Sequence, residues 1–217
     1  MERILELELK ELRKLILSMG QLVEESIDTI QEAIRSKDSN LFLEIFEREK
    51  KINYFHKAVD NECLVLLAKQ APVATDLRFV LAIIKINTDL ERMGDQCVNL
   101  AHSGKEYLGR LPVQTNIKLD EVATYVGEMV RESLDSFVKM DVELAKKVLE
   151  SDDKIDNARN QIFSEMKTYM QSHSQEIDSC LDLILMARNL ERLADHATNI
   201  AEEAIFLSTG KDIRHKN

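Results

Sequence analysis

The chain has 217 residues, of which 44% are hydrophobic and 31% are charged, so it carries enough apolar surface to bury a core and is not a disordered protein. Its formal net charge of −10 argues against a role in binding nucleic acid, because phosphate contacts need clustered lysine and arginine. Only two prolines and six glycines interrupt the chain, so the composition predicts long helices rather than many short strands.

The amino-terminal segment and the cysteines indicate the compartment. Residues 1–14, MERILELELKELRK, carry too many charges for a signal peptide, and the longest apolar run, residues 79–84, is too short to cross a bilayer. The three cysteines, Cys63, Cys97 and Cys180, form no close pair and fall near apolar stripes, which favours free buried thiols in a reducing compartment. We therefore expect a cytoplasmic protein.

The first half of the sequence predicts three helices. Apolar residues recur in alternating steps of four and three over residues 5–33, which is a heptad pattern along one helix. Asp38 fits a turn and a new helix start. A second apolar stripe covers residues 42–66 and is broken before Pro72, because proline disfavours helix at the preceding residue. A third helix is predicted over 75–108.

The pattern then restarts, with helices predicted over 120–139, 142–172 and 175–209. Three segments match between the halves, at offsets of 107, 103 and 100 residues: 23–28 with 130–135, 49–53 with 152–156, and 90–92 with 190–192. The first change in offset is four residues, about one helical turn, so it lengthens a helix without rotating its face. The chain therefore contains a structural repeat.

Each half has three helices of similar length with short connections, which predicts an all-α protein built from two pseudo-symmetric antiparallel three-helix bundles. The stretch 109–115, with Pro112, favours two bundles in tandem, residues 1–111 and 112–217. Six helices around a single core is the alternative.

Each half carries the segment Leu-Glu-Arg-x-x-Asp-x-x-x-Asn-x-Ala in its last helix, once from residue 90 and again from residue 190. Residues four apart stack on one helix face, so the segment forms a polar row with two carboxylates one turn apart. Such carboxylates repel each other unless an arginine or a bound cation compensates. The rows contain Glu91, Asp95 and Asn99 in the first half and Glu191, Asp195 and Asn199 in the second, with Arg92 and Arg192 beside them as possible ion-pair partners.

The preceding helices supply a second acidic pair in each half. Glu49 and Asn53 fall on the apolar stripe of their helix, and Asp152 and Asp156 are their counterparts. A carboxylate on a buried stripe is costly unless it is paired or bound to metal. If neighbouring helices face each other, each half collects oxygen ligands from two helices, a set that suits Mg, Ca, Mn, iron or zinc.

Enzyme signatures are missing from the sequence. A di-iron bundle enzyme needs Glu-x-x-His pairs on inner helix faces, and this pattern does not occur in the acidic segments. There is also no glycine-rich phosphate loop, no His-Glu-x-x-His and no nucleophile elbow. We therefore expect a protein that is not an enzyme, and a helical-bundle enzyme with a multinuclear iron or zinc site stays as the alternative.

Together these segments resemble the PhoU family of phosphate-transport regulators, and the likeness covers both halves. The matching residues of the first half are Met19-Gly20, Leu22-Val23, Glu47, Glu49, Ile52-Asn53, Pro72, Asp76-Leu77-Arg78, Lys85, the run from Asp89 to Asp95, Asn99 and Ala101. Two departures stand out: Glu49 and Asn53 replace more usual aspartates, and residues 174–178 lack the Pro-x-x-x-Asp-Leu-Arg segment.

The resemblance implies two three-helix bundles, each with a multinuclear metal cluster, most typically of iron or zinc, on its surface. It assigns Glu49, Asn53, Glu91 and Asp95 to the first cluster and Asp152, Asp156, Glu191 and Asp195 to the second, with Arg92, Asn99, Arg192 and Asn199 as supporting residues.

The resemblance also implies a role as a regulator. Such a protein would restrain high-affinity phosphate uptake and the phosphate-starvation two-component response by linking the ATPase subunit of the phosphate transporter to a membrane-bound sensor histidine kinase. A homodimer is implied as well, with only peripheral contact to membrane complexes.

Overall fold

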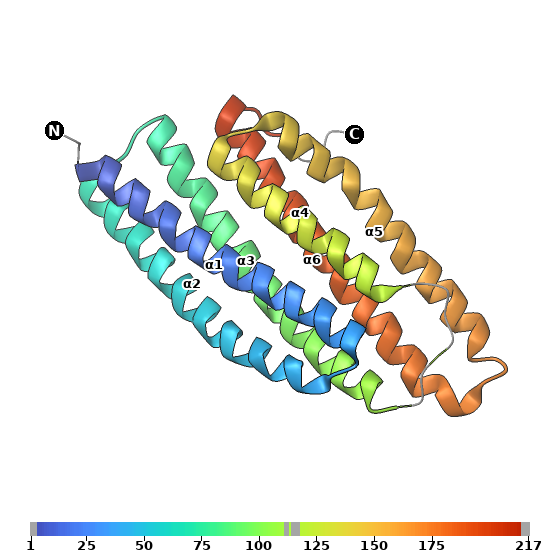
Figure 1. Ribbon diagram of the computed structural model, residues 1–217. Helices are drawn as coiled ribbons and strands as arrows, with labels where there is room; N and C mark the ends of the chain where they lie inside the picture. Colours follow the sequence, from blue (N-terminus) through green and yellow to red (C-terminus); the bar gives the residue numbers. More distant parts are fainter. Residues whose placement is uncertain (1–3, 111–112, 114–117, 214–217) are drawn as a thin grey trace.

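The computed structural model describes residues 4–110, 113 and 118–213, and all regular structure in these ranges is helical. This regular structure consists of six long helices, labelled in Figure 1, and two short 3₁₀ segments, η1 (Ser39–Phe42) and η2 (Ser174–Glu176). The helices are α1 (Ile4–Ser36), α2 (Leu43–Gln70), α3 (Thr75–Leu108), α4 (Leu119–Lys139), α5 (Val142–Tyr169) and α6 (Ile177–Thr209).

The six helices form two antiparallel three-helix bundles that lie side by side (Figure 1). Helices α1, α3, α4 and α6 occupy the middle, where α3 packs along α6 and α1 packs along α4. Helix α2 contacts only α1, α3 and η1 among the described elements, and α5 contacts only α4 and α6. The predicted all-α architecture of two three-helix bundles is confirmed.

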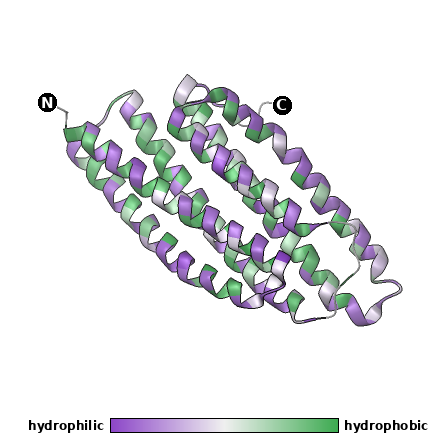
Figure 2. Ribbon diagram, in the orientation of Figure 1, coloured by the Kyte–Doolittle hydropathy of each residue, from purple (hydrophilic) through white to green (hydrophobic). Residues whose placement is uncertain are grey.

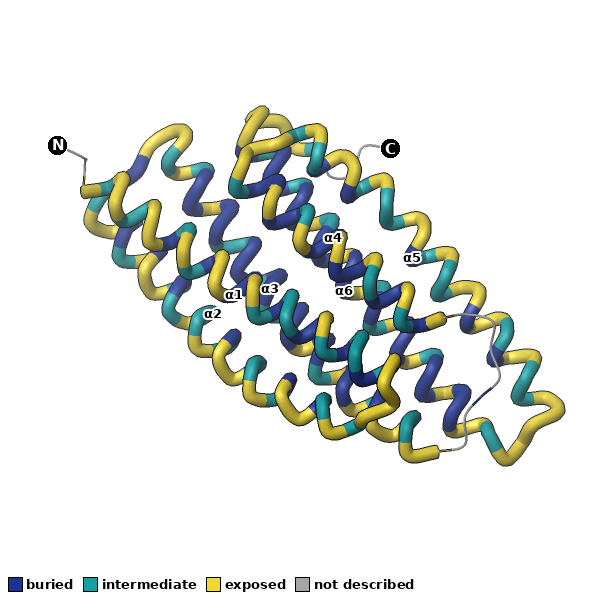
Figure 3. Tube along the Cα trace, in the orientation of Figure 1, coloured by how far each residue is buried: buried dark blue, intermediate teal, exposed yellow. Residues whose placement is uncertain are grey.

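The buried apolar side chains of both halves form one continuous cluster. Figures 2 and 3 show apolar and buried residues along the inward faces of the helices, with polar and exposed residues outside. The two bundles therefore share a core across the boundary between α3 and α6. The predicted division between residues 111 and 112, with Pro112, lies outside the described residues.

Reciprocal packing of glycines relates the two halves. A Cβ at Gly20 of α1 would overlap Leu134 of α4, and a Cβ at Gly127 of α4 would contact Ile27 of α1 at 3.4 Å. Gly127 and Leu134 follow Gly20 and Ile27 by the 107 residues that separate the matched segments. The repeat read from the sequence is therefore a pseudo-two-fold symmetry in space.

Most predicted helix limits agree with the structure. Helix α3 covers the predicted range, and Asp38 caps η1 by accepting a hydrogen bond from the Asn40 backbone N–H. Helix α5 was predicted to extend to residue 172 but ends at Tyr169, where the ring of Tyr169 stacks on His173 at 3.9 Å and the chain turns. The three cysteines are free and buried, as expected. None of the described helices is long and apolar enough to span a membrane.

Candidate metal centres

The acidic set of the second half lies where α5 faces α6. Asp152 and Asp156 stand one turn apart on α5, and Glu191 and Asp195 stand one turn apart on α6. Burial, followed by the negative charges of Asp195, Asp156, Asp153 and Glu191, raises the pKa of Asp152 from 3.8 to about 6. Because charges act on a pKa only over short distances, the four predicted ligands form one acidic patch across the two helices.

The pKa of Asp195, on α6, is shifted by the same acidic patch. Partial burial raises the pKa of Asp195, and the charges of Glu191 and Asp156 add to that effect. His196 and Arg192 oppose it without cancelling it. The neighbouring positive charges therefore do not offset burial and repulsion at either carboxylate, which is the condition that a bound cation would relieve.

The ion pair that the structure places in this patch differs from the predicted one. The guanidinium of Arg159 on α5 lies 3.1 Å from Glu191 Oε1, whereas no ion pair involving Arg92 or Arg192 occurs among the described residues. Arg159 reaches Glu191 from the facing helix α5. The spacing of Arg159, three residues after Asp156, puts it on the same face of α5 and could have revealed it.

The acidic set of the first half is weaker. The side chain of Ile52 lies 3.2 Å from the position of a Cβ on Gly94, so the α2 turn with Glu49 and Asn53 lies against the α3 turn with Glu91 and Asp95. Asn53 Nδ2 donates a hydrogen bond to Glu49 Oε1. Asn53 thus presents its amide nitrogen to the set, and a metal ligand would require its oxygen instead.

The side chains do not yet form a coordination shell. In the described part of the chain, no three His, Cys, Asp or Glu side chains are arranged to hold a metal ion as they stand. The residues present nevertheless fit a hard or intermediate cation, because the second set offers four carboxylates that already repel one another. A metal would therefore need these side chains to rotate toward a shared position.

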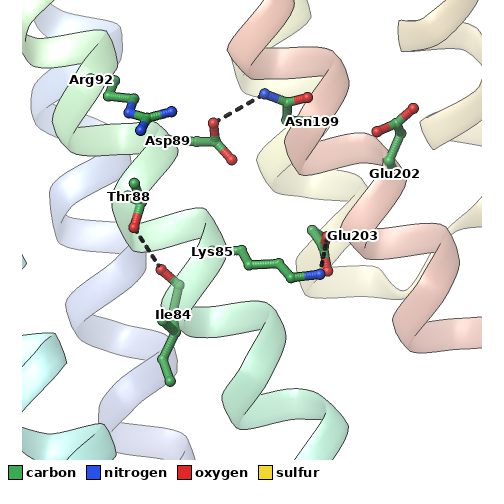
Figure 4. A pocket seen from close by; sticks show the side chains of 8 residues that line it. All are labelled: Ile84, Lys85, Thr88, Asp89, Arg92, Asn199, Glu202 and Glu203. Carbon is green, nitrogen blue, oxygen red and sulfur yellow. Dashed lines mark hydrogen bonds and ion pairs between the residues drawn. The ribbon is translucent and has the colours of Figure 1, made fainter. Parts of the chain in front are cut away.

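Two of the predicted supporting residues, Asn199 and Arg92, lie in a pocket between α3 and α6. Asn199 Nδ2 donates to Asp89 Oδ1 at 3.1 Å, and Arg92 lies beside Asp89 in this pocket, shown in Figure 4. Both residues thus lie at the boundary between the bundles, and their supporting role for the acidic sets stays a prediction. Asn99 is exposed and makes no hydrogen bond among the described residues.

That pocket has a volume of about 320 Å³ and is lined by Ile84, Lys85, Thr88, Asp89, Arg92, Asn199, Glu202 and Glu203. Asp89 also accepts a hydrogen bond from His196 Nδ1 at 2.9 Å, and Lys85 pairs with Glu203 at 2.8 Å (Figure 4). These contacts join α3 of one repeat to α6 of the other. The sequence pattern contains no signal for them, because each pair is more than 100 residues apart.

Both halves of the chain are similar to known proteins. The family model described as PhoU domain matches residues 16–103 and again 119–204. A protein of Pseudomonas putida named phosphate-specific transport system accessory protein PhoU homolog is 36% identical over 210 residues, which cover 96% of this chain and 82% of that protein. A PhoU homolog of Aquifex aeolicus is 35% identical over 97% of this chain and 95% of its own length.

Two crystal structures have the same architecture. PhoU from Pseudomonas aeruginosa superposes with a TM-score of 0.88 and is 33% identical, covering 94% of this chain and 98% of that one. The phosphate transport system regulatory protein PhoU from Streptococcus pneumoniae superposes with a TM-score of 0.84 and is 29% identical, covering 96% and 99%. With the PhoU domain matched in both repeats, these relatives show that the chain belongs to the PhoU family.

Proposed function

We propose that this protein is a regulatory adaptor of phosphate homeostasis that is not an enzyme and that restrains both high-affinity phosphate uptake and the phosphate-starvation two-component response. The observation that carries the proposal is the match of the PhoU domain to both repeats. Relatives named as accessory or regulatory proteins of phosphate transport support it. An adaptor needs shape and charge rather than a reactive centre, and a rigid bundle with long exposed helix faces supplies both.

Its partners in this proposal are the ATPase subunit of the phosphate transporter and the phosphate sensor histidine kinase. The protein would bind both partners from the cytoplasmic side and would contact their membrane complexes only peripherally. The exposed outer faces of α2 and α5 support such a role, because each helix contacts other described elements on its inner side only. A homodimer is part of the same proposal.

The acidic sets would bind iron or zinc, with Mg, Mn or Ca as further candidates. In the second set, a divalent cation would neutralise the repulsion among Asp152, Asp156, Glu191 and Asp195 and would tie α5 to α6. In the first set, Asn53 contributes no charge, so we expect weaker binding at Glu49, Glu91 and Asp95. The cation would thereby order a charged docking surface, which makes partner binding dependent on metal.

The test combines elemental analysis with partner copurification. The wild-type protein, incubated with iron or zinc and desalted, should retain metal in stoichiometric amounts and should copurify with the transporter ATPase subunit or the sensor kinase. Glu191→Ala with Asp195→Ala should lose most of the metal and weaken copurification. Glu91→Ala with Asp95→Ala should lose less metal, since the first set has less charge.

A matched control removes the same charge elsewhere. Glu128→Ala with Glu132→Ala changes two carboxylates one turn apart on α4 that belong to neither acidic set, and should leave metal content and copurification unchanged. Metal-free wild-type protein after loading would contradict the metal sites. Turnover by the metal-loaded protein would favour the metal-dependent enzyme instead of the adaptor.

A further inference from the structure

A second pocket of about 320 Å³ lies between α5 and α6 and continues from the acidic patch of the second half. Its lining is Arg159, Phe163, Ile184, Arg188 and Glu191. Phe163 is 52% exposed, and Ile184 is partly buried and packs against the core. A large aromatic side chain that is half exposed beside a recess is a feature of binding surfaces rather than of stable solvent-facing helices.

Apolar side chains extend this recess along α6. Leu181 and Ile177 lie one and two turns before Ile184 on the same helix face and are 46% and 37% exposed. The positions 177, 181, 184, 188 and 191 follow steps of four and three, so they form a single row about 21 Å long. This row and Phe163 form what we call the α5–α6 groove, which is apolar toward the beginning of α6 and charged toward Glu191.

The first repeat carries the apolar part of this row, with Leu77 and Leu81 37% and 44% exposed, but not its aromatic and basic residues. At the positions equivalent to Arg159, Phe163 and Arg188 it has His56, Asp60 and Thr88. There His56 Nε2 lies 3.4 Å from Asp60, and Asp60 accepts a hydrogen bond from Asn87 Nδ2 at 2.9 Å, so the side chains bind one another. Since the two repeats share their fold, the aromatic and basic residues of the groove are not required by the bundle itself.

The charge of the groove is opposite to that of the protein. In a chain of net charge −10, two guanidinium groups, those of Arg159 and Arg188, and one carboxylate, that of Glu191, line the recess. Arg188 has no ion pair within the described residues, and Arg159 pairs with Glu191 at 3.1 Å. An occupant with acidic side chains would meet an unneutralised guanidinium.

We infer that the α5–α6 groove docks an acidic amphipathic helix of a partner protein. Apolar residues of that helix at i, i+4 and i+7 would contact Phe163, Ile184 and Leu181, and its acidic flank would meet Arg159 and Arg188. A row of about 21 Å accommodates roughly 14 helical residues. The inference rests on the adaptor role proposed above and adds to it the surface and the chemistry of one partner segment.

The test uses two synthetic peptides of 18 residues, each a helix with leucine along one face and either glutamate or lysine on both flanks. Fluorescence anisotropy with the full chain should show that the glutamate peptide binds about tenfold more tightly than the lysine peptide. Phe163→Ala and Arg188→Glu should each weaken binding of the glutamate peptide about tenfold. Tyr125→Ala is the matched control, because Tyr125 on α4 is also 52% exposed, and it should change nothing.

Three results would overturn the inference: equal binding of both peptides, no saturable binding, or binding that Phe163→Ala leaves intact. Sedimentation velocity tests whether a second copy of this chain occupies the groove. A wild-type dimer that Phe163→Ala converts to monomer would show that a second copy, and not a helix of another protein, binds there. The groove and the adaptor role fail separately. If the transporter ATPase subunit copurifies but the peptide does not bind, only the groove fails; if the peptide binds and no transport or sensor component copurifies, only the adaptor role fails.

Discussion

At the scale of single residues, the pKa of Asp152 shows that the acidic patch destabilises the folded, metal-free protein. Burial and four neighbouring carboxylates raise the pKa of Asp152 from 3.8 to about 6, so the folded state holds its proton more tightly than the unfolded chain. The folded state therefore binds more protons between about pH 4 and 6, and the free energy of unfolding falls as the pH rises through that window. Above it the repulsion is fully present.

We predict that Asp152→Asn stabilises the metal-free protein at pH 7 and has little effect well below pH 4, where Asp152 is protonated in both states. Urea unfolding in the presence of a chelator, followed by circular dichroism at several pH values, measures the difference. Glu150→Gln, exposed on the same helix, is the control and should show no such trend. A wild-type protein more stable than Asp152→Asn at pH 7 would contradict the prediction.

At the scale of helices, Gly104 shows why α3 can lie close to η1. A Cβ on Gly104 would overlap the ring of Phe42, with Cε2 at 3.0 Å and Cε1 at 3.1 Å, and Phe42 is fully buried. The second repeat solves the same contact differently, since the equivalent residues are the buried Ala204 and Ala145. The first repeat thus combines a glycine with a large ring at this contact, whereas the second repeat has two small residues at the equivalent positions.

We predict that Gly104→Ala lowers the free energy of unfolding by about 1–3 kcal/mol, because the overlap with a rigid buried ring costs more than the gain of about 1 kcal/mol in helix propensity. Thermal and urea unfolding measure this. Gly109→Ala should fall within about 0.5 kcal/mol of wild type, since its Cβ would meet only two carbonyl oxygens at 3.5 Å. Equal effects of the two substitutions would show that the Phe42 ring yields freely.

At the scale of the whole molecule, the two bundles are symmetric in apolar packing and asymmetric in polar contacts. Asp89 of α3 accepts hydrogen bonds from His196 Nδ1 and Asn199 Nδ2 of α6, at 2.9 and 3.1 Å. The symmetry-equivalent positions hold Asn189, Gln96 and Asn99, which cannot form the same charged arrangement. The Asp89 carboxylate therefore forms hydrogen bonds across one edge of the α3–α6 boundary, and the symmetry-related edge has no carboxylate at the equivalent position.

We predict that Asp89→Ala lowers the free energy of unfolding by about 1–3 kcal/mol, because it leaves two donors at the boundary without their acceptor. A double-mutant cycle with His196→Ala, measured by urea unfolding, should give a coupling energy of about 0.5–3 kcal/mol. Strictly additive effects would mean that the Asp89–His196 contact does not hold the bundles together.

The sequence by itself determined the helices, the repeat and the acidic rows. Helix periodicity, sparse glycine and proline, and three matched segments act over a few turns, so they can be read without knowing which helix lies against which. The limits of α3 followed from such local patterns, whereas the pairing of 49–53 and 152–156 with the rows at 91–95 and 191–195 also required the assumption that neighbouring helices face each other.

Only the tertiary structure decided what the rows contact. In the tertiary structure Glu191 pairs with Arg159, and the Asn53 amide donates a hydrogen bond to Glu49. Asn199 and Arg92 lie at the boundary between the bundles. The tertiary structure also joined both halves in one core and opened the α5–α6 groove. These features depend on the crossing and rotation of helices packed against distant segments, and side-chain direction across such a boundary is not encoded in the spacing along any one helix.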